Sequence, residues 1–248
     1  MKLDAEAAVA LAEDAATLAL LHDRELTPAI LADLRQLGFP ANLGLVPGGE
    51  AGLAAFDLMC MAVLSSPPTN DSGALDELAA DFAGIYLTGA FGASPCESYW
   101  LSDDHLVCQD AMFDLRAIYA GHGLAAPDWR KRPDDHLVFQ LQFLARRLEA
   151  AQSDEDWRAL AAFLDFHLLR WLPDFSRRAA DRCATMFYAA LALLTDAWLE
   201  QVRTLIADQL GEPRLSREEI ALRLGSQREF EPEPVPVAFV PGGLRPGW

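Results

Sequence analysis

The chain has 248 residues, of which 52% are hydrophobic, and this composition argues for a folded globular protein and against intrinsic disorder. The 20 lysine and arginine residues are outnumbered by 37 aspartate and glutamate residues, so the formal net charge is -17. Such a surface repels phosphate backbones, which argues against nucleic acid as a partner and leaves open a cationic partner or no charged partner at all.

The sequence predicts neither a targeting segment nor a membrane span. Acidic residues follow Met1 where a secretory signal needs an apolar core, and no uncharged run reaches the roughly 18 residues that cross a bilayer. We therefore expect a cytoplasmic protein. The four cysteines are scattered without a Cys-x-x-Cys motif, which predicts reduced thiols and not a zinc site or a redox motif.

The first half of the chain carries a succession of helix signals. Residues 3–22 are rich in alanine and leucine, which favour helix. Thr27 and Pro28 fit the N-cap and first position of a second helix, and Gly38 supplies its end, so a helix over 27–37 is predicted. The other elements predicted here are a loop over 40–49 and helices over 50–64, 72–87 and 105–119.

The second half is predicted to contain the longest helices. A leucine stripe follows Pro133 and indicates a buried helix. Ser153 and Asp156 have the spacing of a capping box, and they start a helix whose apolar stripe reaches Trp171 and which Pro173 is predicted to end. The remaining predicted elements are a helix over 178–210 and a short last helix capped by Ser216.

The composition also suggests how the chain is divided. Residues 120–132 hold two glycines, a proline and a basic triplet, and they are predicted to link an N-terminal lobe (about 1–119) to a C-terminal lobe (about 133–228). Residues 229–248 are rich in proline and predict an extended, disordered tail. Strand signals are nearly absent. The predicted fold class is therefore all-α, with one two-lobed helical domain and a C-terminal tail.

The stretch between Asp81 and Glu97 carries no charge but holds three glycines and a proline. It is too broken for a helix interior and too apolar for a solvated loop, so we predict a helix end that runs into a buried turn. A buried carboxylate at Glu97 needs a partner, either an arginine of the fold or one from a bound peptide. Tyr99 and Trp100 could stack on a guanidinium group or line an apolar groove, and core packing is the alternative.

A second candidate site lies at Asp135 and His136, near a predicted helix start. Histidine suits acid–base chemistry, but neighbours on a helix point about 100 degrees apart, so these two do not form a dyad. The alternative is that Asp134 or Asp135 caps the helix or lies at its positive end. His167 lies on an apolar stripe and is expected to be a core histidine. Metal-binding pairs, phosphate loops and nucleophile elbows are absent from the sequence, so we expect no metal, cofactor or catalytic residue.

Three stretches carry a resemblance to a known family. They are Tyr86-Leu-Thr-Gly89 followed by Pro95-Cys-Glu-Ser-Tyr99, then Pro133-Asp-Asp-His-Leu137 with Gln140-Leu141, and last Phe163-x-x-x-His167-Leu168-x-x-Trp171-x-Pro173-x-Phe175, followed by Phe187-Tyr188 and Leu194-Thr195. Together they resemble the TorD/DmsD/NarJ family of cytoplasmic molybdoenzyme chaperones. The chain departs from the family pattern at Gln140, where glutamate is common, and at Cys96 and Trp100, which fill variable positions.

The resemblance implies a two-lobed, all-helical chaperone and not an enzyme. Its implied partners are the twin-arginine leader and the catalytic subunit of a molybdoenzyme, held until the cofactor is inserted. The positions that match leader recognition, or would line the same groove, are Asp135, His136, Tyr86, Gly89, Glu97, Tyr99 and Trp100. Some members form domain-swapped dimers, so the resemblance allows a monomer or a swapped dimer hinged at 120–132.

Three alternatives stay open at this point. The chain could be a NarJ-like assembly factor whose client has no export leader. It could be a small helical metalloenzyme built from its histidines and acids, which a stoichiometric metal would favour. It could also be a helical interaction module for some other amphipathic helix, which a leader peptide unable to compete with that partner would favour.

Overall fold

A computed structural model describes residues 3–66 and 72–229. Within these ranges the regular elements are α- and π-helices, so the predicted all-α fold is confirmed. Met1–Arg214 form one compact unit and Leu215–Trp248 form a second. The first unit contains α1 (Ala5–Asp23), α2 (Pro28–Leu37), α3 (Gly49–Ser65), α4 (Ser72–Phe82), η1 (Ala83–Leu87), α5 (Glu97–Leu101), α6 (Asp110–Gly121), α7 (Leu137–Ala150), α8 (Asp154–Phe163), η2 (Leu164–Leu168), α9 (Leu169–Arg182) and α10 (Met186–Leu210).

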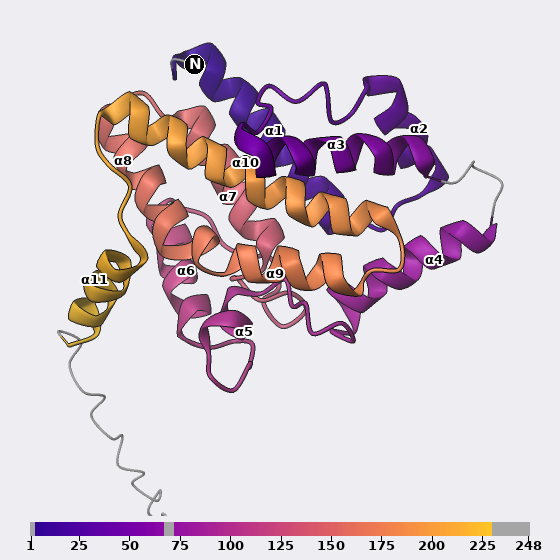
Figure 1. The fold of residues 1–248 in the computed structure, drawn as a ribbon. Helices are drawn as coiled ribbons and strands as arrows, with labels where there is room; N and C mark the ends of the chain where they lie inside the picture. Colours follow the sequence, from indigo (N-terminus) through magenta and orange to yellow (C-terminus); the bar gives the residue numbers. More distant parts are fainter. Residues whose placement is uncertain (1–2, 67–71, 230–248) are drawn as a thin grey trace, which may run out of the picture. The chain divides into compact units, whose positions relative to one another are not determined.

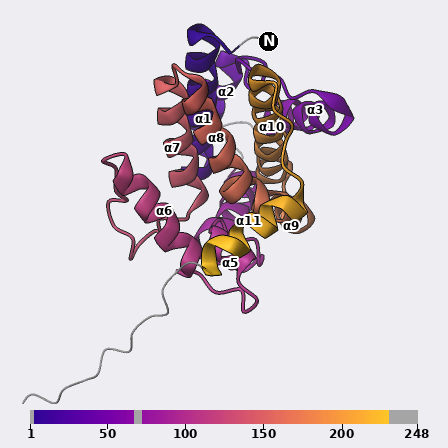
Figure 2. The same ribbon diagram turned by 90° about the vertical axis from the view of Figure 1, so that its left-hand side faces the viewer.

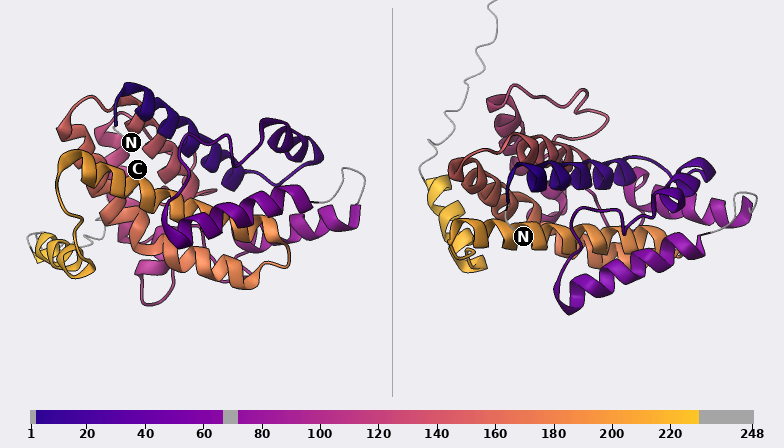
Figure 3. Two further views of the ribbon diagram at one scale, coloured as in Figure 1. Left: turned by 45° about the horizontal axis from the view of Figure 1, so that its top comes forward. Right: turned by 90° about the horizontal axis from the view of Figure 1, so that it is seen from above.

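Helix α10 is the central element of the first unit. It packs against α3, α8 and α9, and Figure 1 and Figure 3 show α3 running beside it. Burial of one large apolar side chain stabilises a fold by about 1.5–3 kcal/mol. A stripe of several buried side chains therefore stabilises a helix more than the helix propensities of its residues do. An apolar stripe of this helix is buried throughout and consists of Phe187, Leu191, Leu194, Trp198 and Leu205.

Helices α1 and α7 lie side by side (Figure 2). The leucine stripe of α7 is fully buried, at 0% exposure for Leu137, Leu141, Leu144 and Leu148. Helix α1 comes from the predicted N-terminal lobe and α7 from the predicted C-terminal lobe. The first compact unit, Met1–Arg214, holds the predicted N-terminal lobe and most of the predicted C-terminal lobe. The division into two lobes joined at 120–132 therefore stays a prediction.

Two helix starts agree with the sequence in detail. The Thr27 hydroxyl accepts a hydrogen bond from the Ile30 amide at 3.3 Å, and Gly38 ends α2 with a φ of 72°. Ser153 and Asp156 form the reciprocal capping box of α8. These signals act between residues one turn apart, so the local sequence alone encodes them.

Pro173 does not end a helix, contrary to the prediction. It lies in the second turn of α9, and α9 itself follows directly after the π-helix η2. The Leu169 amide donates to the Leu164 carbonyl, five residues back, so the hydrogen-bond register changes just before the proline. A proline is costly where the helical ladder is regular, and it is found where the ladder is already interrupted. The apolar stripe from Trp157 to Trp171 stays buried across this change of register.

The break between α9 and α10 is a second difference, because the sequence predicts one helix over 178–210. The Asp81 carboxylate accepts hydrogen bonds from the Ala184 amide at 2.9 Å, the Thr185 amide at 2.7 Å and the Thr185 hydroxyl at 2.6 Å. Asp81 is 1% exposed and belongs to α4. A carboxylate from a distant element therefore fixes the turn that precedes α10, and no local signal announces it.

The region after the glycine-rich turn is also more broken than predicted. The predicted helix over 72–87 is present as α4 continued by η1, but the short helix α5 was not anticipated. Helix α6 begins at Asp110 and not at His105, because His105 and Cys108 have positive φ values of 52° and 60°. Such a backbone conformation cannot continue a right-handed helix.

The second unit contains α11 (Arg217–Glu229). Its start is capped as predicted, because the Glu219 amide donates to the Ser216 hydroxyl at 3.2 Å and the Ser216 amide donates to the Glu219 carboxylate at 2.7 Å. The predicted tail lies outside the described residues from position 230 onward. Across 3–66 and 72–229, none of the helices has both the length and the apolar character needed to cross a bilayer.

Candidate functional site

The two unusual segments of the sequence meet in the structure. The Glu97 amide donates to the Asp135 carbonyl at 3.1 Å, and the Leu137 amide donates to the Pro95 carbonyl at 2.7 Å. These bonds form an antiparallel bridge in which Cys96 lies opposite His136. The bridge joins the start of α5 to the start of α7, so residues predicted separately as candidates belong to one structural junction.

Asp135 is fully buried in this junction, at 0% exposure. Its Oδ2 atom accepts a hydrogen bond from the Ser98 amide at 2.8 Å, and its carbonyl accepts one from the Gln140 side chain at 2.9 Å. Burial raises the pKa of the Asp135 carboxyl, and the hydrogen bonds from Ser98 oppose that rise. The Oδ1 atom has no hydrogen-bond partner among the described residues.

His136, and not Asp134 or Asp135, is the N-cap of α7. Its Nδ1 atom accepts a hydrogen bond from the Val138 amide at 3.2 Å, so that nitrogen carries no proton. Burial lowers the pKa of His136 to about 3, and the nearby Arg132 adds to the effect. The imidazole is only 5% exposed, so burial keeps it neutral and fixed at the helix start.

Asp134 is held by a different partner. Arg116 of α6 contacts its two oxygens at 3.3 and 2.9 Å, a bidentate arrangement. The same guanidinium lies over the rings of Phe113 and Trp129, with distances of 5.4 and 5.3 Å to the ring centres. Asp134 therefore attaches α6 to the segment before α7, which is a structural role.

Glu97 finds a partner that the sequence interpretation did not foresee. Its Oε1 atom lies 3.1 Å from Nδ1 of His167, while the prediction named an arginine of the fold or of a peptide. Burial raises the pKa of Glu97, and the hydrogen bond with His167 and the charge of Arg170 oppose the rise. His167 is thus the satisfied inner histidine that was predicted. The Oε2 atom of Glu97 is buried without a hydrogen-bond partner in the described part of the chain.

Tyr86 belongs to a second buried network, centred on His22. The Thr195 hydroxyl donates to the Leu191 carbonyl at 2.8 Å, so Thr195 must accept from His22 Nε2, which lies 2.8 Å away. His22 Nδ1 then lacks a proton and accepts from the Tyr86 hydroxyl at 2.6 Å. The sequence interpretation missed His22, although it falls on the same helical face as the buried Leu11 and Leu18.

Gly89, Tyr99 and Trp100 form the accessible part of the predicted site. Gly89 is exposed with a φ of 66°, a conformation that favours glycine. Tyr99 and Trp100 are half-buried and pack edge to face, with ring centres 5.2 Å apart. Tyr99 also packs on His105 at 5.0 Å, which ties the aromatic pair to the loop over 102–109.

The loop between α5 and α6 is a feature that sequence reasoning passed over. Leu106 and Val107 at its tip are 52% and 44% exposed. Asp103 and Asp104, which precede them, are also exposed. Carboxylates beside exposed apolar side chains suit a ligand that is both cationic and apolar. Among the described residues no three His, Cys, Asp or Glu side chains gather in a way that could hold a metal ion.

Comparison with known proteins adds a family relationship. The family model described as "Nitrate reductase delta subunit" matches residues 48–177, a range that holds the bridge and both candidate segments. Proteins named "Chaperone protein TorD" are similar to the chain: that of Vibrio cholerae serotype O1 is 31% identical over 144 residues, 55% of this chain and 65% of the relative.

Two further relatives with the same name show the same pattern. The protein of Vibrio vulnificus is 35% identical over 48% of this chain and 59% of its own length. The protein of Photobacterium profundum is 27% identical over 65% of this chain and 76% of its own length. The chain thus spans somewhat less than two thirds of the V. cholerae and V. vulnificus relatives. Because the family model covers more than half of its length, the chain belongs to the nitrate reductase delta subunit family, and it is similar to proteins named "Chaperone protein TorD".

Proposed function

We propose that this chain is a cytoplasmic chaperone for a molybdenum-cofactor oxidoreductase. It binds the twin-arginine leader, the cofactor-free enzyme or both, and holds the client for cofactor insertion before export. The proposal rests on the family relationship and on the names of the relatives, which are chaperones and not enzymes. It assigns no catalytic residue and no resident cofactor to the chain.

One observation carries the assignment of the leader site. The bridge between Cys96 and His136 sets α5 so that Tyr99 and Trp100 are partly exposed beside the loop that carries Asp103 and Asp104. A twin-arginine leader offers two guanidinium groups and an apolar segment. Guanidinium groups pair with carboxylates and stack on aromatic rings, and the apolar segment suits the exposed tip of the same loop.

The seven predicted site residues take two kinds of role in this proposal. The accessible residues Tyr99, Trp100 and Gly89 contact the leader, and Tyr86 supports the turn from its buried network with His22. Glu97, Asp135 and His136 act as positioning residues, because their side chains are at most 5% exposed. A buried group that holds α5 in place affects leader affinity without touching the leader.

The test is leader binding measured by fluorescence anisotropy with a labelled leader peptide of the candidate client. Trp100→Ala should weaken binding about tenfold or more, as expected for an aromatic anchor of an interface. Met186→Ala is the matched control, because Met186 is a large side chain at 44% exposure on another element. Replacing the two leader arginines by glutamine should remove the salt dependence. Equal affinity of the wild type, Trp100→Ala and the control would reject this surface as the leader site.

A second candidate function is favoured by the family description, which names a nitrate reductase subunit. In that case the client has no export leader, and the chain acts as an assembly factor on the body of the enzyme. Affinity capture from the native cell separates the two. Recovery of a molybdoenzyme subunit that is lost on leader deletion supports the first function, and recovery regardless of the leader supports the second.

The oligomeric state expected from the resemblance is a monomer or a domain-swapped dimer hinged at 120–132. Light scattering during size-exclusion chromatography distinguishes the two masses. Shortening of the hinge should favour the swapped form if the hinge lies there, because a short connection prevents the two parts of one chain from packing together. A mass unaffected by hinge length at all concentrations would place any dimer interface elsewhere.

A further inference from the structure

A pocket of about 290 Å³ opens between helices of the second half of the chain and the end of α6. Three phenylalanine rings form much of its wall: Phe143 comes from α7, Phe163 from α8 and Phe166 from η2. Leu160 and Ile118 add aliphatic side chains. An apolar cavity of about 150 Å³ is large enough to bind benzene, so this pocket has room for one aromatic ring with a small substituent.

His167 supplies a polar atom to this apolar pocket. Its Nδ1 atom lies 3.1 Å from Oε1 of Glu97, a carboxylate that is fully buried. The imidazole ring packs on Phe163 with 5.5 Å between ring centres, and its side chain is 12% exposed where it lines the pocket. The other ring nitrogen, Nε2, has no hydrogen-bond partner among the described residues. The buried carboxylate therefore fixes the imidazole and leaves Nε2 to a ligand.

The other polar groups of the lining are engaged or peripheral. Arg147 pairs with Asp156 at 3.1 Å, so its charge is already balanced. His122 is exposed, and its ring packs on Phe143 with 5.4 Å between ring centres. His167 is thus the group in the lining that can select a ligand by hydrogen bonding.

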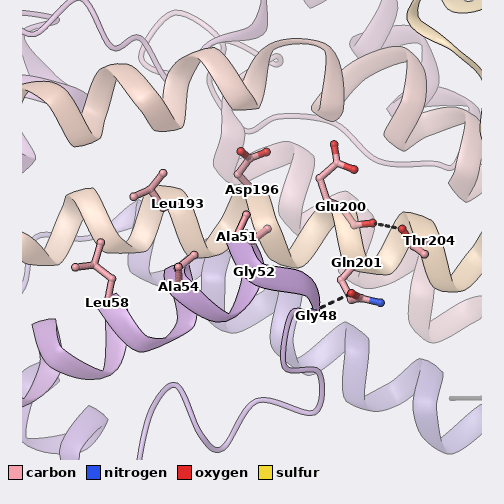
Figure 4. A pocket seen from close by; sticks show the side chains of 12 residues that line it. Gly48, Ala51, Gly52, Ala54, Leu58, Leu193, Asp196, Glu200, Gln201 and Thr204 are labelled. Carbon is pink, nitrogen blue, oxygen red and sulfur yellow. Dashed lines mark hydrogen bonds between the residues drawn. The ribbon is translucent and has the colours of Figure 1, made fainter.

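The groove between α3 and α10 does not offer a comparable group among the described residues (Figure 4). There the Gln201 side chain accepts a hydrogen bond from the Gly48 amide at 3.0 Å. The Asp196 Oδ2 atom lies 3.1 Å from the Ser176 hydroxyl, and the Asp196 Oδ1 atom is buried. These side chains serve the fold itself, so His167 is the stronger candidate for contact with a ligand.

The surroundings of His167 restrict the chemistry of the ligand. Stacked and edge-on contacts with phenylalanine favour an aromatic ring. An ion would lose its hydration in this apolar pocket without gaining a free counter-charge, and the net charge of -17 repels anions. A hydroxyl group both donates and accepts hydrogen bonds, so it suits Nε2 whether or not that nitrogen carries a proton.

We propose that this pocket binds a small neutral phenol, with the aromatic ring against Phe143 and Phe163 and the hydroxyl group at His167 Nε2. The pocket is distinct from the proposed leader surface, because Tyr99 and Trp100 do not line it. Phenol binding here is independent of the proposed chaperone function.

The test is an NMR titration of the protein with p-cresol and with toluene, which differ by the hydroxyl group. The wild type should bind p-cresol about fivefold more tightly than toluene, as one hydrogen bond requires. Glu97→Met/His167→Phe removes the buried pair together, so that neither partner is left buried alone, and it should reverse the order because the hydroxyl group then has no partner. Asp165→Leu/Arg203→Met removes a buried ion pair outside the pocket and should keep the preference for p-cresol. Equal binding of the two ligands to the wild type, or an unchanged preference in Glu97→Met/His167→Phe, would overturn the proposal.

A steric variant tests the pocket independently of hydrogen bonding. Ala159 lines the pocket at an exposed position of α8, so Ala159→Phe should fill it and weaken both ligands about tenfold or more. Ala16→Phe, at an exposed position of α1 outside the pocket, should weaken neither. Circular dichroism verifies that the variants are folded. Undiminished binding of p-cresol to Ala159→Phe would reject the pocket as the phenol site.

A blocked tyrosine, N-acetyl-tyrosinamide, identifies the source of the phenol ring. It should bind more weakly than p-cresol, because its backbone amides find no partner in the apolar wall. Tighter binding of the blocked tyrosine would mean that the pocket takes a tyrosine side chain of a polypeptide, and the assignment to a free phenol would be wrong. Trp100→Ala should leave p-cresol binding unaffected, so the leader surface and the pocket can fail separately.

Discussion

Cys96 and His136 lie opposite each other in an antiparallel bridge, and this pairing sets the start of α5 and the start of α7 together. Both residues are buried, at 5% exposure each. Burial raises the pKa of the Cys96 thiol, so the group is neutral at physiological pH and suits its apolar surroundings. A change at either segment is therefore transmitted to the other.

Asp135→Ala is expected to weaken leader binding while the helical circular dichroism is retained. The substitution removes the acceptor of the Ser98 amide, and an unpaired buried donor costs about 1–3 kcal/mol. Asp135→Asn keeps an oxygen for that amide and should retain most of the affinity, as a positioning role requires. Glu149→Ala, at an exposed carboxylate of α7, is the control. Unchanged affinity in Asp135→Ala would remove Asp135 from the site.

Asp165 and Arg203 form a buried ion pair whose disruption should destabilise the fold. The guanidinium contacts the two carboxylate oxygens at 2.9 and 2.7 Å, and both side chains are 5% exposed. Asp165→Leu leaves Arg203 buried without its partner, which should lower the free energy of unfolding by about 3–5 kcal/mol. The double variant Asp165→Leu/Arg203→Met should recover much of the loss. Urea denaturation measures both, and additive losses would contradict the pairing.

Tyr86→Phe is expected to lower the free energy of unfolding by about 1–3 kcal/mol, because His22 Nδ1 loses its donor in a buried position. In a double-mutant cycle with Thr195→Val, the two effects should be coupled through the His22 ring. Tyr99→Phe, at a half-buried tyrosine, serves as the comparison and should change stability little. Equal effects of the two tyrosine substitutions would argue against the assigned tautomer of His22.

Stability is expected to fall between about pH 6.5 and pH 3 through His22 and His136. Burial lowers the pKa of each to about 3, while the unfolded chain titrates near 6.5. The unfolded state therefore binds more protons in this window, so acidification favours unfolding, by about 2 kcal/mol for each histidine at pH 5. The raised pKa values of Glu97 and Asp135 act in the opposite direction, because the native state then binds more protons above pH 4.

The contribution of His136 can be isolated by substitution. His136→Asn preserves a side chain that caps helices well and removes the titrating group, so the loss of stability from pH 7 to pH 5 should be smaller. His122→Asn is the control, because His122 is exposed. The measurement is the urea midpoint at several pH values. Identical pH profiles for the two variants would show that His136 does not titrate as its burial requires.

The sequence by itself determined the helical fold, the caps at Thr27, Ser153 and Ser216, and the two segments that form the bridge. Caps and turns depend on hydrogen bonds between residues three or four positions apart, and apolar stripes depend on the helical period. Both are properties of the local chain. For the same reason the family resemblance could be recognised from short stretches.

Only the tertiary structure decided which distant groups meet. The pairing of Glu97 with His167, the hydrogen bonds of Asp81 to the turn before α10, and the burial of Asp135 depend on how the helices pack. The same holds for Asp196, which the sequence places on a long helix without indicating that it borders an open groove. Buried polar groups take whichever partner the packing brings within about 3 Å, and that distance is set by the whole fold and not by neighbours in the sequence.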